Sequence, residues 1–211
     1  MTLYLDSAST DDARRAMVLG LVGGVTTNPT LLSQQAGSPL EVLSELTAIC
    51  PGTVFYQLTA SSPEALKDEA LRARDIAENI GLKIPCTRDN LALAAELSRT
   101  GVVGMTAIFS AEQAYLAGQA GVAFILPYVN RAKRLRGHSP VAAMRAAIAG
   151  THTEIVAASI KSGAEALETL GDGAHHLTLP LALIEAMGHD PLTEQAIDDF
   201  RQRGGAIIPG D

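Results

Sequence analysis

The feature that most constrains the fold of this sequence is a regular alternation of short apolar runs with longer amphipathic stretches. The short runs are rich in β-branched and aliphatic residues and predict strands at 3–7, 24–28, 54–59, 82–87, 102–109, 124–131, 154–161 and 176–180. The stretches between them predict helices at 11–19, 39–49, 63–79, 88–98, 111–120, 140–149, 164–170 and 181–187. Strands that alternate with helices in this way form a parallel sheet with right-handed crossover connections.

Eight such units in 211 residues favour a closed barrel over an open sheet. A (β/α)8 TIM barrel has this number of units, and the chain lies near the small end of its size range. The alternative, an open doubly wound sheet, usually has about five or six strands and a glycine-rich first turn. The chain contains neither a G-x-G-x-x-G nor a P-loop motif. We therefore predict an α/β fold, a (β/α)8 TIM barrel, as one domain over residues 1–211, with an extra C-terminal helix near 193–203 and a tail at 204–211.

Composition excludes several classes of partner. The formal net charge is -7, which disfavours nucleic acid and anionic membranes because both require a basic face. No apolar run reaches the roughly 20 residues of a membrane span, and the N-terminus lacks the basic region of a signal peptide. Two cysteines fit a reducing compartment, with Cys86 expected as a small apolar filler against the helices. We therefore expect a cytoplasmic protein that acts on small molecules.

No metal site is expected in this sequence. The adjacent histidines His175 and His176 would point to opposite faces of a strand, and no other ligand stands at a zinc-like spacing. We expect no metal and no other cofactor.

Polar side chains late in the predicted strands mark the expected site, because chemistry in a TIM barrel is located at the C-terminal ends of the strands. They are Asp6, Thr26, Asn28, Gln57, Lys83, Thr106, Tyr128, Arg131, Ser159 and Lys161. Burial of an unpaired charge is costly, so such groups are expected to find partners in one another.

Lys83 is the most informative of these residues. A free lysine has a pKa near 10.4, too high for it to attack a carbonyl at neutral pH, whereas burial lowers the pKa of a Schiff-base lysine toward roughly 7–8. The alternative is a structural lysine that pairs with Asp6. Asp6 itself could instead cap the helix that follows the first strand.

The segment from Thr26 through Asn28 to a proline joins the second strand to its helix. Its residues suit a turn, and they could equally donate hydrogen bonds to a polyhydroxylated substrate. Spacing alone leaves both interpretations open.

Arg131, Ser159 and Lys161 form a second group at the predicted ends of strands six and seven. Two cations and a hydroxyl suit a phosphate dianion, and TIM barrels often bind phosphate near their last strands. The alternative is a set of solvated charges at the rim. Three further basic residues extend this group and are expected as exposed loop charges, namely Lys133, Arg134 and Arg136.

Five short pieces, taken together, resemble a known family. They are Leu-Tyr-Leu-Asp at 3–6, Gly-Val-Thr-Thr-Asn-Pro at 24–29, Lys-Ile-Pro at 83–85, Pro-Tyr-Val-Asn-Arg at 127–131 and Ala-Ala-Ser-Ile-Lys at 157–161. In this order and spacing they resemble the small transaldolases and fructose-6-phosphate aldolases. The resemblance extends from the first residues to the Leu-Pro pair at 179–180.

The resemblance implies class I aldolase chemistry in a (β/α)8 barrel. It implies that Lys83 forms the Schiff base with the ketose, and that Asp6 contacts substrate hydroxyls and assists proton transfer. Thr26 and Asn28 match residues that hold the dihydroxyacetone part. A covalent electron sink of this kind allows carbanion chemistry without a metal.

The resemblance also implies roles at the phosphate end of the substrate and a subunit arrangement. Thr106 matches a threonine that helps to fix a catalytic water, and Ser159 and Arg131 match phosphate ligands, with Lys161 nearby. Members of the family form ring-like homo-oligomers, pentamers or decamers. The additional C-terminal helix is expected to pack on a neighbouring subunit.

Three positions separate the two branches of this family. Transaldolases typically carry glutamate, phenylalanine and asparagine where this chain has Gln57, Tyr128 and Gly104, and its choices resemble the aldolases. A tyrosine hydroxyl adds a proton donor for the enamine, which an aldolase must protonate. We therefore expect an aldolase that cleaves or forms fructose 6-phosphate, or a close analogue, from dihydroxyacetone and glyceraldehyde 3-phosphate. The alternatives are a transaldolase and a non-catalytic barrel that binds a sugar phosphate.

The chain departs from the family pattern in two places. Met105 and Leu126 replace smaller residues and are expected to narrow the pocket beside the Schiff base. The basic run with Lys133, Arg134 and Arg136 replaces a stretch that is often acidic, which indicates either an altered subunit contact or a more anionic substrate.

Overall fold

The computed structural model describes residues 1–204 and contains a closed barrel of eight parallel strands in chain order. The strands are β1 (Leu3–Asp6), β2 (Val22–Thr26), β3 (Val54–Gln57), β4 (Ile80–Pro85), β5 (Val103–Ile108), β6 (Phe124–Pro127), β7 (Glu154–Ala157) and β8 (His176–Leu179). The barrel closes where β8 pairs with β1, with Leu3 opposite Leu177. The predicted (β/α)8 fold is confirmed.

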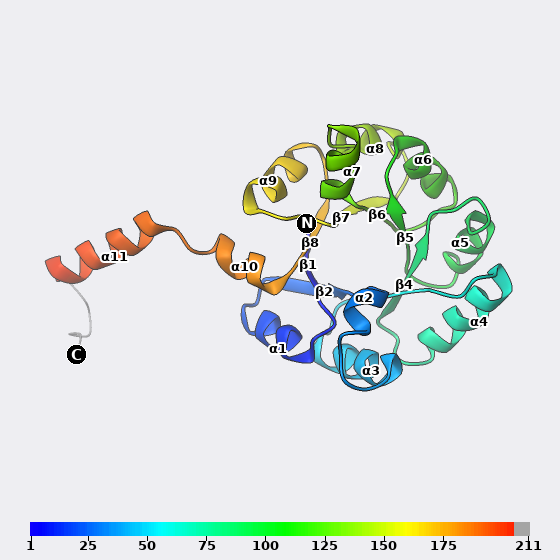
Figure 1. Ribbon diagram of the computed structural model, residues 1–211, viewed down its shortest axis with the longest axis horizontal. Coiled ribbons are helices and arrows are strands. Elements are labelled where there is room, and N and C mark those ends of the chain that lie inside the picture. The colour runs from blue at the N-terminus through cyan, green and yellow to red at the C-terminus, as the bar shows by residue number, and fades with distance from the viewer. Residues whose placement is uncertain (205–211) are drawn as a thin grey trace.

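Helices surround the strands, and the last helix, α11, extends away from the barrel to one side (Figure 1). The helices are α1 (Thr10–Val18), α2 (Pro29–Leu32), α3 (Pro39–Ile49), α4 (Pro63–Arg74), α5 (Leu91–Leu97), α6 (Ala111–Gln119), α7 (Val129–Arg136), α8 (Val141–Ala147), α9 (Gly163–Gly171), α10 (Leu181–Met187) and α11 (Pro191–Arg203). The predicted C-terminal helix corresponds to α11, and all of the predicted tail except Gly204 lies outside the described residues.

Local sequence explains where several helices begin. Ser62 accepts a hydrogen bond from the amide of Ala65, and Pro63 follows at the first helical position of α4, where no amide hydrogen is needed. Ser38 and Glu41 form a reciprocal capping box at the start of α3. These caps fix the residue at which each of the two helices begins.

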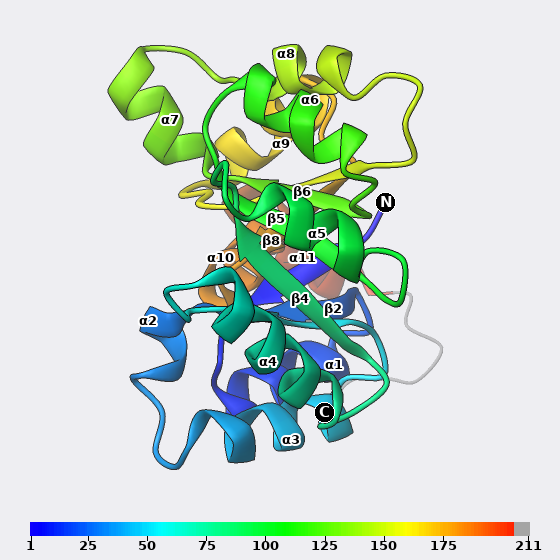
Figure 2. The ribbon, with the colours of Figure 1, turned by 90° about the vertical axis from the view of Figure 1, so that its right-hand side faces the viewer.

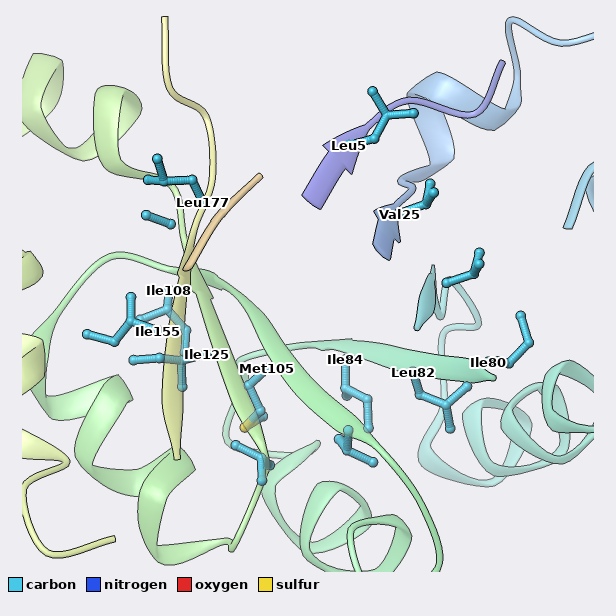
Figure 3. Close-up of a cluster of buried hydrophobic side chains, with 14 of the residues drawn as sticks. Leu5, Val25, Ile80, Leu82, Ile84, Met105, Ile108, Ile125, Ile155 and Leu177 are labelled. Atoms are coloured by element: carbon cyan, nitrogen blue, oxygen red, sulfur yellow. The ribbon is translucent and has the colours of Figure 1, made fainter. Parts of the chain in front are cut away.

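Two sets of apolar side chains form the core. The larger set lies between strands and helices and includes Ile84, Met105 and Ile125 (Figure 3). The smaller set has four buried members, which are Tyr4, Phe55, Leu126 and Val156. Because these four share the strand face of Lys83 by register and alternation, they fill the inside of the barrel.

The structure corrects several predicted boundaries. The strand predicted at 124–131 ends at Pro127, and the residues after it form α7. The strand predicted at 154–161 ends at Ala157. Tyrosine and valine at 128–129 favour strands, but the chain leaves the sheet there at the rim of the barrel. The short helix α2 was likewise not predicted.

Helix α4 is five residues shorter than predicted because β4 begins earlier. Ile80 pairs with Val54 in the sheet, so the chain must be extended at that point. The side chain of Asn79 donates hydrogen bonds to the carbonyls of Cys50 at 2.8 Å and Gly52 at 3.0 Å, which fixes this transition.

Within residues 1–204, no helix is both long enough and apolar enough to span a membrane. Helices α2 and α7 lie on one side of the barrel and the N-terminus on the other (Figure 2). The side with α2 and α7 carries the C-terminal ends of the strands, where the candidate site lies.

Candidate active site

A cavity of about 440 Å³ opens at the C-terminal ends of the strands. Nine of the ten predicted site residues line it, namely Asp6, Thr26, Asn28, Gln57, Lys83, Tyr128, Arg131, Ser159 and Lys161. The tenth, Thr106, is fully buried below the cavity surface. The structure therefore brings the two predicted groups of residues together at one cavity.

Lys83 lies on β4 with its side chain inside the barrel and only 4% exposed. Its ammonium or amine group, Nζ, donates a hydrogen bond of 2.7 Å to the backbone carbonyl of Thr27. Burial lowers the pKa of Lys83 to about 8, while the charge of Asp6 acts in the opposite direction. A substantial fraction of the amine is therefore neutral near physiological pH.

Asp6 is held beside this lysine by a chain of hydroxyl groups. Thr26 Oγ1 donates to Asp6 Oδ1 at 3.1 Å, and Thr178 Oγ1 lies 2.6 Å from Thr26 Oγ1. Burial raises the pKa of Asp6, and the nearby Lys83 and the Thr26 hydrogen bond oppose that rise. A carboxyl group with a raised pKa is suited to accept and return a proton.

The geometry contradicts both structural alternatives for this pair, namely that Asp6 caps a helix and that Lys83 forms an ion pair with Asp6. Ser9, not Asp6, caps α1 by accepting a hydrogen bond from the amide of Asp12. Among residues 1–204 the structure forms no salt bridge between Asp6 and Lys83. The two groups interact through space without a direct ion pair.

Gln57 and Thr106 present polar atoms that the protein does not satisfy. Gln57 Oε1 and Thr106 Oγ1 are buried and have no hydrogen-bond partner within residues 1–204. Buried polar atoms normally have a partner, so these two are available to a water molecule or a substrate. After Thr106, β5 shifts register, and Ala107 has a positive φ of 55°, a local distortion typical of strands next to active sites.

Tyr128 lies at the start of α7, and its ring is held from two sides. The ring of Phe109 meets it edge to face with centroids 5.7 Å apart, and the Arg131 guanidinium lies 5.0 Å from its centroid. This packing fixes the tyrosine as part of the cavity wall.

The three residues expected to bind phosphate lie at the same cavity, although they do not lie at strand ends. Arg131 lies in the first turn of α7, and Lys161 lies in the loop after β7. Ser159, in the same loop, has a left-handed backbone with φ of 62°, which is costly for a residue with a side chain and often occurs at ligand sites. The three side chains line the cavity together.

The position of Asn28 fits both interpretations made from the sequence. Its Oδ1 accepts a hydrogen bond from the amide of Leu31 and so caps α2. Its side chain also lines the cavity, which leaves the amide nitrogen to donate toward a ligand.

The two residues expected to narrow the pocket, Met105 and Leu126, lie on opposite faces of the sheet. Met105 belongs to the helix-facing core with Ile84, so the expectation that it narrows the pocket was wrong (Figure 3). Its neighbour Thr106 takes the inner face, and strand alternation sends Met105 outward. Leu126 faces the inside of the barrel and lies against Gly104, the residue that pairs with Lys83, but it is fully buried and does not line the cavity.

Sequence reasoning missed two contributors to the site. The Thr27 carbonyl that binds Lys83 is a backbone group, so no sequence pattern marks it. Thr178 supports Thr26 from β8, and a polar residue on the inner face of an apolar strand could have indicated it.

His175 and His176 do not gather metal ligands. Within the described part of the chain, no group of three or more His, Cys, Asp or Glu side chains could hold a metal ion. His176 instead joins the N-terminus to β7, since its Nδ1 accepts from the Thr2 amide and its Nε2 lies 2.8 Å from Glu154 Oε2.

The sequence model described as Transaldolase/Fructose-6-phosphate aldolase matches residues 3–206. The chain belongs to this family. The resemblance carried by the five sequence pieces is thus confirmed, and the protein is a transaldolase-like aldolase.

Curated relatives of the family agree over nearly the full chain. A probable transaldolase of Rhizorhabdus wittichii is 37% identical over 205 residues, which cover 95% of this chain and 94% of the relative. A probable transaldolase of Symbiobacterium thermophilum is 34% identical over 205 residues, 95% of each chain.

Solved structures of other families share the fold. Thiamine phosphate pyrophosphorylase from Pyrococcus furiosus matches with a TM-score of 0.57, 15% identity and 85% of each chain. A mandelate oxidase mutant matches with a TM-score of 0.61 and 17% identity over 86% of this chain and 64% of its own. At such low identity, the likeness supports the barrel fold alone.

Proposed function

We propose that this family member is a class I aldolase that uses Lys83 to cleave and form fructose 6-phosphate or a close analogue. The observation that supports this most directly is a lysine amine that is buried beside a polar cavity and has a pKa of about 8. A neutral amine at the base of a cavity is the requirement for imine formation with a ketone.

In the first step, the Lys83 amine adds to the C2 carbonyl of the ketose. Loss of water from the resulting carbinolamine gives an iminium ion. The hydrogen bond from Nζ to the Thr27 carbonyl restricts the orientation of the amine and so favours attack from a fixed direction.

In the second step, Asp6 accepts the proton of the C4 hydroxyl. The C3–C4 bond breaks, its electron pair passes into the iminium to form an enamine, and C4 becomes the aldehyde carbon of glyceraldehyde 3-phosphate. The raised pKa of Asp6 suits it to this transfer, and Thr26 holds its carboxylate in place.

The rest of the cavity would position the two ends of the substrate. Asn28 and Thr26 would contact the dihydroxyacetone part from the β2–α2 segment. Arg131 and Ser159 would bind the phosphate, with Lys161 adding charge, because all three line the outer part of the same cavity.

The fate of the enamine decides between hydrolysis and transfer. Protonation of C3, followed by addition of water at C2, releases dihydroxyacetone and restores the Lys83 amine. The buried Gln57 Oε1 and Thr106 Oγ1 are free to hold the necessary water, and the Tyr128 hydroxyl supplies a proton donor at the cavity wall. These three residues support aldolase activity.

A transaldolase is the second candidate, since the curated relatives carry that name. It would use the same steps up to the enamine and then pass the three-carbon unit to an aldose acceptor. The two candidates therefore share Lys83 and Asp6 and differ only in how the enamine is consumed.

Borohydride trapping tests the shared step. Incubation with fructose 6-phosphate and borohydride should add one three-carbon or ketose unit to the intact protein, at a peptide that contains Lys83. The Lys83→Ala variant should gain no mass, whereas Lys133→Ala, which changes a surface lysine bound to Glu168, should be trapped normally. An unmodified wild-type protein would contradict both candidates.

Product analysis separates the candidates. An aldolase should release free glyceraldehyde 3-phosphate and dihydroxyacetone from fructose 6-phosphate without an acceptor. A transaldolase should turn over continuously only when an aldose acceptor is added.

We further propose that the chain folds as a single domain and that several copies assemble into a homo-oligomer. Helix α11 has no buried residue, and it exposes large apolar side chains that include Leu192 and Phe200. A second copy of the chain would cover them.

A further inference from the structure

A second cavity lies beside the proposed active-site cavity, along α7. This outer cavity has a volume of about 460 Å³ and is lined by Asn130, Arg131, Arg134, Leu135, Ser159 and Lys161. Arg131, Ser159 and Lys161 line both cavities, so they form a shared wall between them.

Helix α7 carries four basic residues and no acidic one, and they divide into two pairs. Arg131 and Arg134 lie three residues apart, which places them on the same face of the helix. Lys133 and Arg136 form the other pair, again three residues apart.

Lys133 and Arg136 both interact with other residues of the same chain. Lys133 forms a salt bridge of 2.7 Å with Glu168, and Arg136 donates a hydrogen bond of 2.9 Å to the carbonyl of Phe109. Neither Arg131 nor Arg134 forms a salt bridge with any of residues 1–204. Of these four residues, only Lys133 has a carboxylate partner among residues 1–204, and the two arginines at the outer cavity have none.

The nearest buried acid does not neutralise this cavity through an ion pair. Glu165 is held by the side-chain amide of Asn130 at 2.9 Å and by the backbone amide of Lys161 at 2.8 Å. The ammonium group of Lys161 forms no salt bridge within the described part of the chain. Three cationic side chains therefore line one cavity.

We propose that the outer cavity binds a second anionic group of the substrate. The inference rests on the proposed function, in which Arg131 and Ser159 bind one phosphate. Arg134 would then bind a further phosphate or carboxylate carried next to the first, and Lys161, which lines both cavities, would add positive charge to both sites. The substrate class is a sugar phosphate with two neighbouring anionic groups at the end remote from the Schiff base.

Charge geometry favours an anion over other occupants. Two guanidinium groups on one helix face can each form paired hydrogen bonds with a phosphate or carboxylate. A single phosphate at Arg131 would leave Arg134 without a partner. A second anion would compensate it within the same cavity.

Calorimetric titration of the full-length protein with inorganic phosphate and with pyrophosphate tests this assignment. Pyrophosphate should bind more tightly than phosphate, and Arg134→Gln should weaken pyrophosphate binding by about fivefold or more, while phosphate binding changes by less than about twofold. Lys133→Gln, a matched change on the same helix at a residue paired with Glu168, should leave both affinities unchanged. Arg131→Gln should weaken both.

Two results would overturn the proposal. Equal effects of Arg134→Gln on the two anions, including no effect on either, would make Arg134 a solvated rim charge. A change in oligomer mass on Arg134→Gln would assign the residue to a subunit contact. The titration measures binding without turnover, so its outcome is independent of whether Lys83 is trapped by borohydride.

Discussion

At Lys83, burial and a nearby carboxylate act on the same pKa in opposite directions. Burial favours the neutral amine and brings the pKa down to about 8, whereas the negative charge of Asp6 favours the ammonium form. The Thr27 carbonyl holds the nitrogen in place at 2.7 Å. One residue thus combines the two requirements of an imine-forming lysine, partial neutrality and a fixed position.

The rate of imine formation should therefore depend on pH with a midpoint near 8. Below this value the rate should fall about tenfold per pH unit, because the neutral fraction falls in that proportion, and above it the rate should level off. Asp6→Asn removes the charge that raises the pKa of Lys83, so its midpoint should lie at lower pH. Imine formed at each pH and then trapped with borohydride at one common pH gives the profile. A midpoint that stays fixed or rises in Asp6→Asn would contradict this coupling.

Tyr128 gives a second test at the scale of a single residue. Tyr128→Phe keeps the ring that packs on Phe109 and loses only the hydroxyl. Release of free dihydroxyacetone should fall by about a hundredfold, and transfer of the three-carbon unit to an added aldose should fall less, because only release needs a proton on the enamine. Tyr115→Phe, at a half-exposed tyrosine on α6, is the matched control. A parallel fall of both activities would show that Tyr128 is not the proton donor.

At the scale of elements, the neighbouring strands β5 and β6 fit together through a glycine. A Cβ atom at Gly104 would lie 2.6 Å from Leu126 Cδ1 and 3.4 Å from Phe124 Cβ. Leu126 is fully buried inside the barrel, so it has little freedom to move away. Gly104 pairs with Lys83, so this contact lies on the strand next to the lysine.

Gly104→Ala should destabilise the protein by about 1–3 kcal/mol through this overlap. Leu126→Ala alone should cost about 2–5 kcal/mol because it leaves a cavity. The double variant should cost less than the sum of the two, since the smaller side chain at 126 makes room for the new methyl group. Urea unfolding gives the free energies of unfolding. Gly171→Ala at the end of α9, where nothing lies within 4 Å, is the control and should not destabilise. Additive costs in the double variant would contradict the steric explanation.

At the scale of the whole molecule, the barrel closes between its first and last strands, and the last helix lies outside it. Closure depends on β8, which pairs with β1, and on His176, which links the Thr2 amide to Glu154. Helix α11 lies apart from the barrel and none of its residues is buried (Figure 1). Exposed apolar side chains of this size usually mark an interaction surface.

Disruption of α11 should lower the assembled mass. Leu192 and Phe200 are 74% and 66% exposed, and the double variant Leu192→Glu/Phe200→Glu should shift light scattering toward the monomer while circular dichroism stays unchanged. Leu71→Glu, at a half-exposed leucine on α4, makes the same type of change away from α11 and should leave the mass as it is. A wild-type protein that is itself monomeric, or a mass unaffected by the α11 changes, would contradict an oligomer built on this helix.

Much of the site could be predicted because strand chemistry is periodic. Alternation assigned Lys83 and Asp6 to the inner face, and their late position in the strands assigned them to the mouth of the barrel, where both line the cavity. The same rule, applied to Met105 beside the inward Thr106, would have excluded Met105 from the pocket. The prediction was wrong because it considered the size of the side chain at position 105 and not the face of the strand on which that side chain lies.

Other features could not be predicted, since they depend on contacts between distant parts of the chain. Residues 128–131 have the composition of a strand end, yet they begin α7, and this helix places Arg131 and Arg134 on one face. The Thr27 carbonyl reaches Lys83 across 56 positions of sequence, and Thr178 reaches Thr26 across 152. No local pattern records such distances.

By itself, the sequence determined the number of strand–helix units, the barrel they form and the residue types at its mouth, because periodicity and residue chemistry are local properties. Only the tertiary structure decided which polar groups meet, which cations stay uncompensated and how far the lysine is buried. Those quantities arise when barrel closure and strand register bring together side chains whose separation in space is independent of their separation in sequence.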